Sequence, residues 1–95
     1  MLIVVSYDVS TTDDGKKRLR KVAKLCQNYG VRVQNSVFEC NVDPAQWLML
    51  KTGLLKLYDP DSDSLRFYRL GSNFQGKIEH YGAKKASGVD DAIIL

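Results

Sequence analysis

The sequence predicts an α+β fold, and three observations support this prediction. A β-branched apolar run opens the chain, two segments have the apolar spacing of helices, and the remaining segments alternate apolar and polar residues as strands do. Their order is βαββαβ with one or two extra strands at the C-terminal end. This order favours a ferredoxin-like sandwich, in which an antiparallel sheet carries both helices on one face.

The length of 95 residues corresponds to one small domain. A chain of this size gains stability when it buries surface against a second copy, so we expect a homodimer. We predict a ferredoxin-like domain over 1–82. Residues 83–95 are then a flexible connection and a C-terminal strand packed on a sheet edge, that of the partner protomer. The longest apolar stretch, Leu2 to Val5, is too short to span a bilayer and no secretory signal is visible, so we expect a cytoplasmic protein.

The first two elements are distinguished by their periodicities. Leu2 to Tyr7 is apolar almost throughout, as expected of a central strand. Asp14 to Asn28 has the spacing of an amphipathic helix, with its N-cap within residues 11–14 and its stop at Gly30. The apolar stripe of this helix consists of Leu19, Val22, Ala23 and Cys26.

The middle of the chain contains a clear helix start. Residues 31–42 predict two strands or one sharply bent strand, because a polar Gln-Asn-Ser break separates two alternating stretches. Asp43, Pro44 and Gln46 then provide an N-cap, a first-turn proline and a third-position glutamine, so a helix is predicted to about Leu57. A strand over 64–70, a turn over 71–76 and a short strand over 77–81 complete the pattern.

Several kinds of catalytic site are excluded by composition. The single histidine, His80, cannot form a nucleophilic triad here, and neither a glycine-rich phosphate loop nor zinc-ligand spacing is present. Residues 59–63 imitate the start of a calcium loop but lack its later ligands, so we predict a solvated acidic turn. Cys26 and Cys40 are predicted to be buried free thiols.

Asp8 is the first candidate for chemistry, because it breaks an apolar run where a strand leaves the core. A carboxylate there is a candidate ligand of Mg²⁺ or Mn²⁺, although one carboxylate alone makes a poor magnesium site. Two copies of Asp8 near a dimer axis would share one hydrated ion and support phosphodiester hydrolysis. The alternative is that Asp8 caps the turn at the strand exit.

Basic residues are concentrated on the first helix. The formal net charge is only +3, but six of the 14 basic residues lie within nine positions. Such a cluster attracts phosphate groups electrostatically, and the alternative is a solvated helix face. The cluster consists of Lys16, Lys17, Arg18, Arg20, Lys21 and Lys24.

The motifs around these residues resemble those of a known family. They are the strand ending in Tyr7-Asp8, the basic helix ending in Tyr29-Gly30, and the run Arg-Val-Gln-Asn-Ser-Val-Phe-Glu-Cys at 32–40. They are similar to those of the small core CRISPR-associated endonuclease family (Cas two), the partner of the CRISPR integrase in spacer acquisition. The similarity extends over residues 1 to about 82.

The resemblance implies a ferredoxin-like homodimer that acts in CRISPR adaptation and bridges integrase dimers over duplex DNA. Some family members are described as Mg²⁺-dependent endonucleases acting on double-stranded DNA or single-stranded RNA. The metal-binding and catalytic aspartate of the family falls on Asp8. The expected nucleic-acid-binding residues are Lys16, Lys17, Arg18, Arg20, Lys21 and Arg32, and the expected site-shaping residues are Tyr7, Ser36 and Phe38, of which Phe38 is equally expected as a core or interface aromatic.

Two alternative functions remain open at this stage. The first is a non-catalytic DNA-binding scaffold that bridges integrase dimers and in which Asp8 is incidental. The second is a single-stranded RNA reader of the RRM type, which shares the βαββαβ order and stacks bases on exposed aromatic side chains. Tyr7 and Phe38 are the candidate stacking residues for such a reader.

Overall fold

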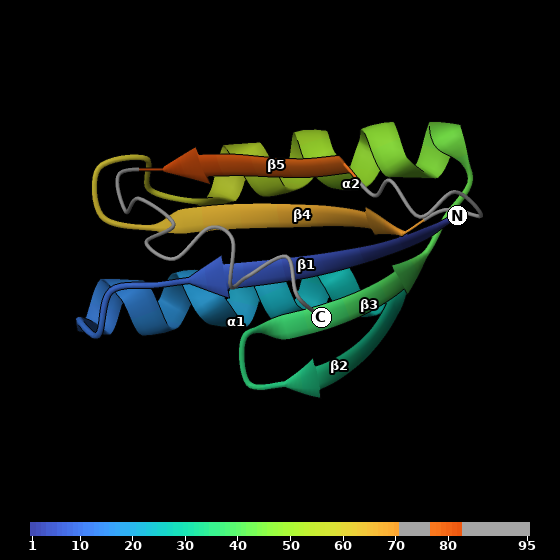
Figure 1. Ribbon diagram of the computed structural model, residues 1–95. Helices are drawn as coiled ribbons and strands as arrows, with labels where there is room; N and C mark the ends of the chain where they lie inside the picture. The colour runs from blue at the N-terminus through green and yellow to red at the C-terminus, as the bar shows by residue number, and fades with distance from the viewer. Residues whose placement is uncertain (71–76, 83–95) are drawn as a thin grey trace.

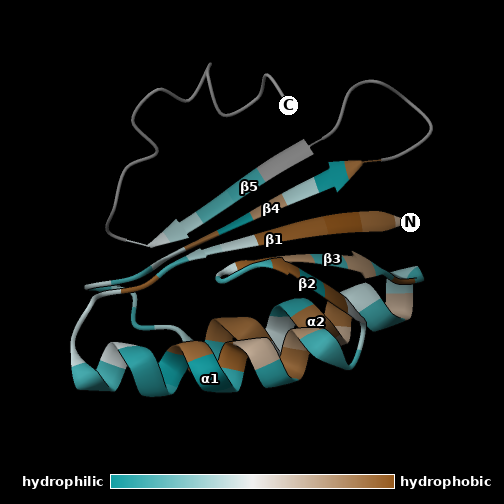
Figure 2. Ribbon diagram, turned by 90° about the horizontal axis from the view of Figure 1, so that it is seen from below, coloured by the Kyte–Doolittle hydropathy of each residue, from teal (hydrophilic) through white to brown (hydrophobic). Residues whose placement is uncertain are grey.

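A single antiparallel sheet forms one layer of the molecule and two helices form the other (Figures 1 and 2). The structure is a computed structural model that describes residues 1–70 and 77–82, without the side chains of 77 and 78. The predicted turn over 71–76 and the predicted connection and strand over 83–95 lie outside the described residues. The elements are β1 (Leu2–Asp8), α1 (Asp13–Gln27), β2 (Gly30–Gln34), β3 (Val37–Asn41), α2 (Pro44–Leu57), β4 (Ser64–Leu70) and β5 (Lys77–Gly82).

The strand order of the sheet is β2-β3-β1-β4-β5, and every neighbouring pair is antiparallel. Both helices lie on the same face of the sheet, as Figure 2 shows. The predicted α+β ferredoxin-like architecture is therefore confirmed, and the segment 31–42 forms two strands rather than one bent strand.

The core lies between the sheet and the helices because successive side chains of a strand point to opposite faces. In β1, Ile3, Val5 and Tyr7 are all buried, whereas the intervening residues are half-buried or exposed. The two helices bury their apolar faces against these buried strand residues. The other core residues are Val22, Ala23, Cys26, Phe38, Cys40, Val42, Trp47, Leu50, Leu54, Leu65 and Phe67.

The start of α1 agrees with the prediction, whereas its end does not. Thr12 is the N-cap, and its hydroxyl accepts a hydrogen bond from the Gly15 amide at 3.1 Å. The prediction that Gly30 stops the helix is wrong, because α1 ends at Gln27 with Asn28 as C-cap and Gly30 begins β2. A Cβ atom at Gly30 would lie 1.9 Å from the Glu39 carbonyl oxygen, so close approach of β2 to β3 requires glycine there.

The start of α2 confirms the predicted cap. The Asp43 carboxylate accepts from the Gln46 amide at 2.7 Å, and the Gln46 side chain accepts from the Asp43 amide at 3.0 Å. This reciprocal capping box and Pro44 in the first turn fix where the helix begins. Gly53 lets α1 approach α2, because a Cβ there would lie 2.8 Å from the Leu25 side chain.

The second face of the sheet carries neither of the two helices (Figure 2). Leu2 and Leu70 lie on this face with 36% and 48% of their surfaces exposed. In residues 1–70 and 77–82, neither helix is long and apolar enough to cross a membrane.

Candidate functional site

Asp8 is the last residue of β1 and lies opposite Ser64 of β4. Its side chain is exposed, and the alternation along β1, in which Ile3, Val5 and Tyr7 are buried, places it on the sheet face that the helices leave open. The carboxylate therefore lies where solvent can reach it, at the edge of the molecule next to the loop that leads into α1.

Tyr7 points to the opposite side of the sheet. It is only 1% exposed, and its hydroxyl donates a hydrogen bond to the Asp63 carboxylate. Phe38 is also fully buried on the helix side. These two aromatics cannot stack bases on the open face, so the placement of both argues against the RRM-type reader.

Asp63 is the centre of a buried polar cluster that joins four parts of the chain. Its carboxylate accepts from the Tyr7 hydroxyl, from the Ser10 amide at 3.2 Å and from the Asp59 amide at 3.0 Å. Arg18 adds two bonds, from Nε at 2.7 Å and from Nη2 at 3.1 Å. We call these five residues the Asp63 cluster.

The cluster determines the protonation of its members. Burial raises the pKa of the Asp63 carboxyl, but hydrogen bonds from Arg18 and Tyr7 more than offset this and lower it to about 2. Burial and the bond to Asp63 raise the pKa of the Tyr7 hydroxyl well above its usual range. At neutral pH Asp63 is therefore a carboxylate, Arg18 is a charged guanidinium and Tyr7 is a neutral phenol.

The Asp63 cluster corrects the prediction for residues 59–63. We expected a solvated acidic turn, but Asp63 has no exposed surface. The acidic run could not reveal this, because the donors that offset the burial of Asp63 include Tyr7 and Arg18, far away in sequence.

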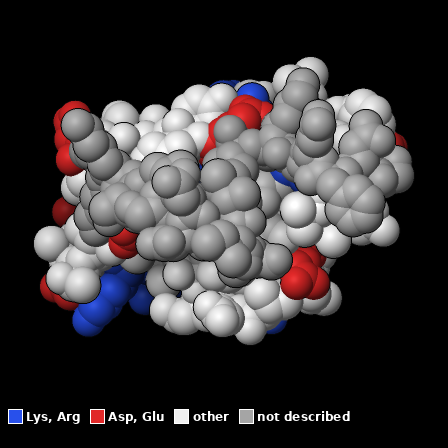
Figure 3. Space-filling view, in the orientation of Figure 1, with Lys and Arg blue, Asp and Glu red and all other residues white. Residues whose placement is uncertain are grey.

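The basic residues of α1 separate into two groups. The side chain of Arg18 is 20% exposed and is held by Asp63, so its guanidinium is turned toward the protein rather than toward solvent. In Figure 3 basic atoms gather at the lower left, where α1 begins in Figure 1. The exposed basic residues of the helix are Lys16, Lys17, Arg20, Lys21 and Lys24.

Arg32 lies in β2, and Ser36 lies in the turn between β2 and β3. The Arg32 guanidinium donates to the Asn35 carbonyl at 2.8 Å and lies 5.5 Å from the Phe38 ring centroid. The Ser36 carbonyl accepts from the Tyr7 amide at 2.9 Å, which brings this turn beside the end of β1. Of these residues, Ser36 is thus the one with a direct contact to the segment that carries Asp8.

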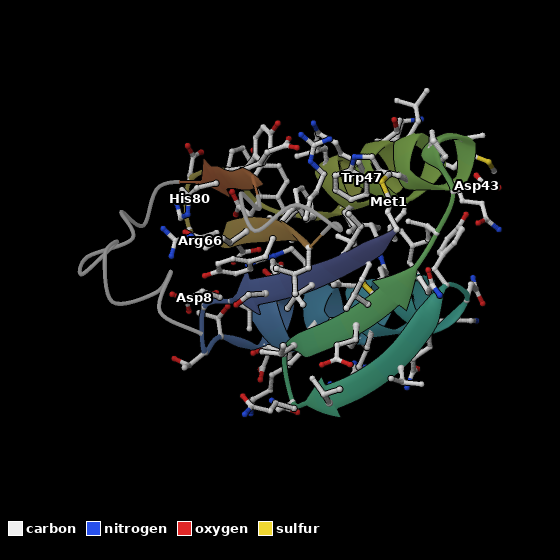
Figure 4. The ribbon with its side chains drawn as sticks, turned by 45° about the vertical axis from the view of Figure 1, so that its right-hand side comes forward. Met1, Asp8, Asp43, Trp47, Arg66 and His80 are labelled. Carbon is white, nitrogen blue, oxygen red and sulfur yellow. The ribbon has the colours of Figure 1, made fainter. Side chains whose placement is uncertain are left out.

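The open face also brings Arg66 and His80 toward Asp8, a grouping that the sequence analysis missed. Ser6, Arg66 and His80 are aligned across β1, β4 and β5, and Asp8 lies two residues beyond Ser6. Figure 4 shows Asp8, Arg66 and His80 at the same end of the sheet. Both ring nitrogens of His80 are shielded from solvent, and neither has a hydrogen bond within the described part of the chain. This grouping is visible only from the strand register, and the sequence alone does not show which residues are paired across the strands.

The described residues include no group of three or more side chains that could hold a metal ion. Asp8 nevertheless has the right donor chemistry, since Mg²⁺ binds one or two carboxylates and fills its other positions with water and substrate phosphate. Asp63 does not qualify, because it is buried and its oxygens already accept five hydrogen bonds. One protomer therefore offers Asp8 as the candidate ligand at this end of the sheet.

The fold and this end of the sheet define a class: small ferredoxin-like proteins with an exposed carboxylate at the end of the first strand and a basic first helix. A family model described as CRISPR associated protein Cas2 matches residues 1–78. The chain belongs to the Cas2 family.

Individual relatives and solved structures agree with this family. The chain is 60% identical to CRISPR-associated endoribonuclease Cas2 of Chlorobaculum tepidum and 57% identical to CRISPR-associated endonuclease Cas2 of Halalkalibacterium halodurans, in each case over all of both chains. The crystal structure of Streptococcus pyogenes Cas2 at pH 6.5 is similar with a TM-score of 0.73 and 56% identity, covering 79% of this chain and 92% of that chain.

Proposed function

We propose that the chain is a metal-dependent endonuclease of CRISPR adaptation that hydrolyses phosphodiester bonds of double-stranded DNA or single-stranded RNA and binds duplex DNA during spacer integration. The observation that carries the proposal is the exposed carboxylate of Asp8 at the end of β1, together with the five exposed basic residues of α1, the helix that follows it in the chain. The names of the relatives, endoribonuclease and endonuclease, support it.

The residues divide the work between binding and chemistry. The exposed basic residues of α1, with Arg32, would bind the phosphate backbone through a sequence-independent electrostatic attraction. Asp8 would hold a divalent ion, Mg²⁺ or Mn²⁺, together with Asp8 of a second copy in a homodimer. When bound, such an ion activates water and polarises a phosphoryl oxygen.

Arg18 has a different part in this proposal from the one expected from sequence. Its guanidinium is engaged by Asp63, so it would orient the basic helix relative to β1 rather than bind a phosphate. Tyr7 and Phe38 would shape the site from the helix side of the sheet, where both are buried. Ser36 would do so through its carbonyl oxygen, which accepts a hydrogen bond from the Tyr7 amide.

A second candidate function is the non-catalytic scaffold that bridges CRISPR integrase dimers on DNA. It is favoured by the five exposed basic residues of α1, which can bind the phosphate backbone of DNA without a metal ion. Both candidates require nucleic-acid binding that weakens steeply with salt, and only the endonuclease requires Asp8.

The deciding experiment compares Asp8→Asn with the wild type on duplex DNA and single-stranded RNA, with and without Mg²⁺. Asp61→Asn is the matched control, because it removes the same charge from another exposed aspartate. We expect Asp8→Asn to lose at least about 100-fold in Mg²⁺-dependent cleavage, since even outer-shell substitutions at metal sites cost roughly 10–100-fold. Asp8→Asn should still bind nucleic acid. The Asp61→Asn control should cleave as the wild type does.

Cleavage that survives in Asp8→Asn would contradict the proposed site. Absence of cleavage in the wild type, with salt-sensitive DNA binding intact, would favour the scaffold.

A further inference from the structure

We propose that Asp63 is a positioning residue for Asp8, because its buried carboxylate binds the chain on both sides of that residue, through the Tyr7 hydroxyl and the Ser10 backbone amide. This inference rests on the proposed function of Asp8 as a metal ligand. It assigns to the Asp63 cluster a role in presenting the Asp8 carboxylate to a divalent ion.

The anchors lie on either side of Asp8 in the chain. Tyr7 donates its hydroxyl to one oxygen of Asp63, and the Ser10 amide donates to the other at 3.2 Å. Between them lie only Asp8 and Val9. The Tyr7 amide also donates a hydrogen bond to the Ser36 carbonyl at 2.9 Å. The end of β1 is therefore held both by Asp63 and by the turn between β2 and β3.

Asp63 is itself held rigidly. Arg18 of α1 binds both of its oxygens, and the Asp59 amide binds Oδ2 at 3.0 Å. A carboxylate has about four lone-pair sites, so the five donors leave none for an ion or a substrate. Asp63 therefore acts through its neighbours and is not a ligand or a catalytic residue.

The end of a strand frays unless something holds it. Asp8 is exposed at such an end, and a carboxylate that samples many directions binds an ion weakly, because ordering it costs conformational entropy. By fixing Tyr7 and Ser10, Asp63 restricts the backbone that carries Asp8. This is the same physical role as that of outer-shell groups at metal sites, which orient the direct ligands.

The test uses Tyr7→Phe and Asp63→Asn, with Tyr81→Phe as a matched control. Tyr81 makes the same kind of bond, from its hydroxyl to the Glu79 carboxylate at 2.9 Å, and it is aligned with Tyr7 two strands away. The readouts are Mg²⁺ affinity by isothermal titration calorimetry, hydrogen exchange of the Asp8 to Ser10 amides without metal, and metal-free affinity for duplex DNA.

We expect Tyr7→Phe and Asp63→Asn to weaken Mg²⁺ binding about 10–100-fold, in line with outer-shell substitutions. The Asp8 to Ser10 amides should exchange faster. In Tyr7→Phe the DNA affinity should stay within about twofold, because Arg18 keeps its bonds to Asp63 and the exposed basic residues of α1 are unchanged. Tyr81→Phe should bind Mg²⁺ as the wild type does. If Asp63→Asn fails to fold, Tyr7→Phe, which removes one hydroxyl, decides the question.

Wild-type Mg²⁺ affinity in folded Tyr7→Phe would overturn the positioning role. An equal loss in Tyr81→Phe would also overturn it, because the effect would then be general destabilisation. The same titration with Asp8→Asn separates the two proposals. Mg²⁺ binding that persists in Asp8→Asn overturns the metal site and the positioning role together, whereas binding lost in Asp8→Asn but kept in Tyr7→Phe overturns the positioning role alone.

Discussion

A fully buried carboxylate such as Asp63 is costly unless other groups replace the water it loses. Here two hydrogen bonds from Arg18 supply the opposite charge, and the Tyr7 hydroxyl and two backbone amides complete the replacement. Removing one member leaves the others buried without their partner, which is why such clusters are sensitive to substitution.

The stability of the protein should therefore depend on pH through Asp63. Its pKa is lowered to about 2 in the folded chain, against an ordinary value of about 3.9 in the unfolded chain. The stabilisation is thus fully present above about pH 4 and is lost as the pH falls from about 4 toward 2. Urea unfolding should show the wild type losing about 2 to 3 kcal/mol more than Asp63→Asn between pH 6 and pH 2.

Comparing the two proteins isolates Asp63 from the other carboxylates, which titrate in both. Equal losses of unfolding free energy in the wild type and in Asp63→Asn would show that the cluster does not carry this dependence.

Sequence reasoning found Asp8 but not Asp63, for a physical reason. Asp8 interrupts an apolar run, a local signal, whereas Asp63 lies in an acidic turn among residues of the same type. One usable signal was present, because Arg18 lies four residues before Val22 and eight before Cys26, on the buried stripe of α1. A basic residue on that stripe indicates a buried acidic partner, but it does not say which one.

At the scale of elements, the helix starts were predictable because the groups that cap them are adjacent in sequence. Thr12 and the Asp43 capping box both lie where the pattern places them. The end of α1 was not predictable in the same way. Gly30 is an ordinary helix-stop signal, yet here it serves the approach of β2 to the Glu39 carbonyl, a contact made only in the folded sheet.

The cap of α2 gives a second stability prediction. Asp43→Ala removes the acceptor for the Gln46 amide and should cost about 1 kcal/mol. For a domain of this size the melting temperature should fall by about 4–8 °C in a thermal unfolding experiment. Asp61→Ala is the control, since Asp61 is exposed in a turn and caps neither helix. A melting temperature equal to that of the control would show that the capping box is not stabilising.

For the whole molecule, the two-layer arrangement followed from the order of elements, and the comparisons place it in the Cas2 family. The open face explains why a partner is expected. It combines the exposed Leu2 and Leu70 with the half-buried Val4 and Tyr68, and apolar surface of this kind favours association. The homodimer stays a prediction, and so does the sharing of one ion by two copies of Asp8.

Mixed dimers would test that sharing directly. Wild-type and Asp8→Asn protomers carrying different affinity tags can be coexpressed, and the mixed dimer isolated by two successive purifications and checked by sedimentation. If one ion needs both carboxylates, replacing either removes half of its ligand charge, so Mg²⁺ affinity and cleavage should fall nearly as far as in the doubly substituted dimer. If each protomer holds its own ion, the mixed dimer should keep about half of the wild-type activity at saturating Mg²⁺ and bind half as many ions, because its sites are independent. The metal stoichiometry by calorimetry separates the two cases even when cleavage is slow, since it counts ions rather than turnovers.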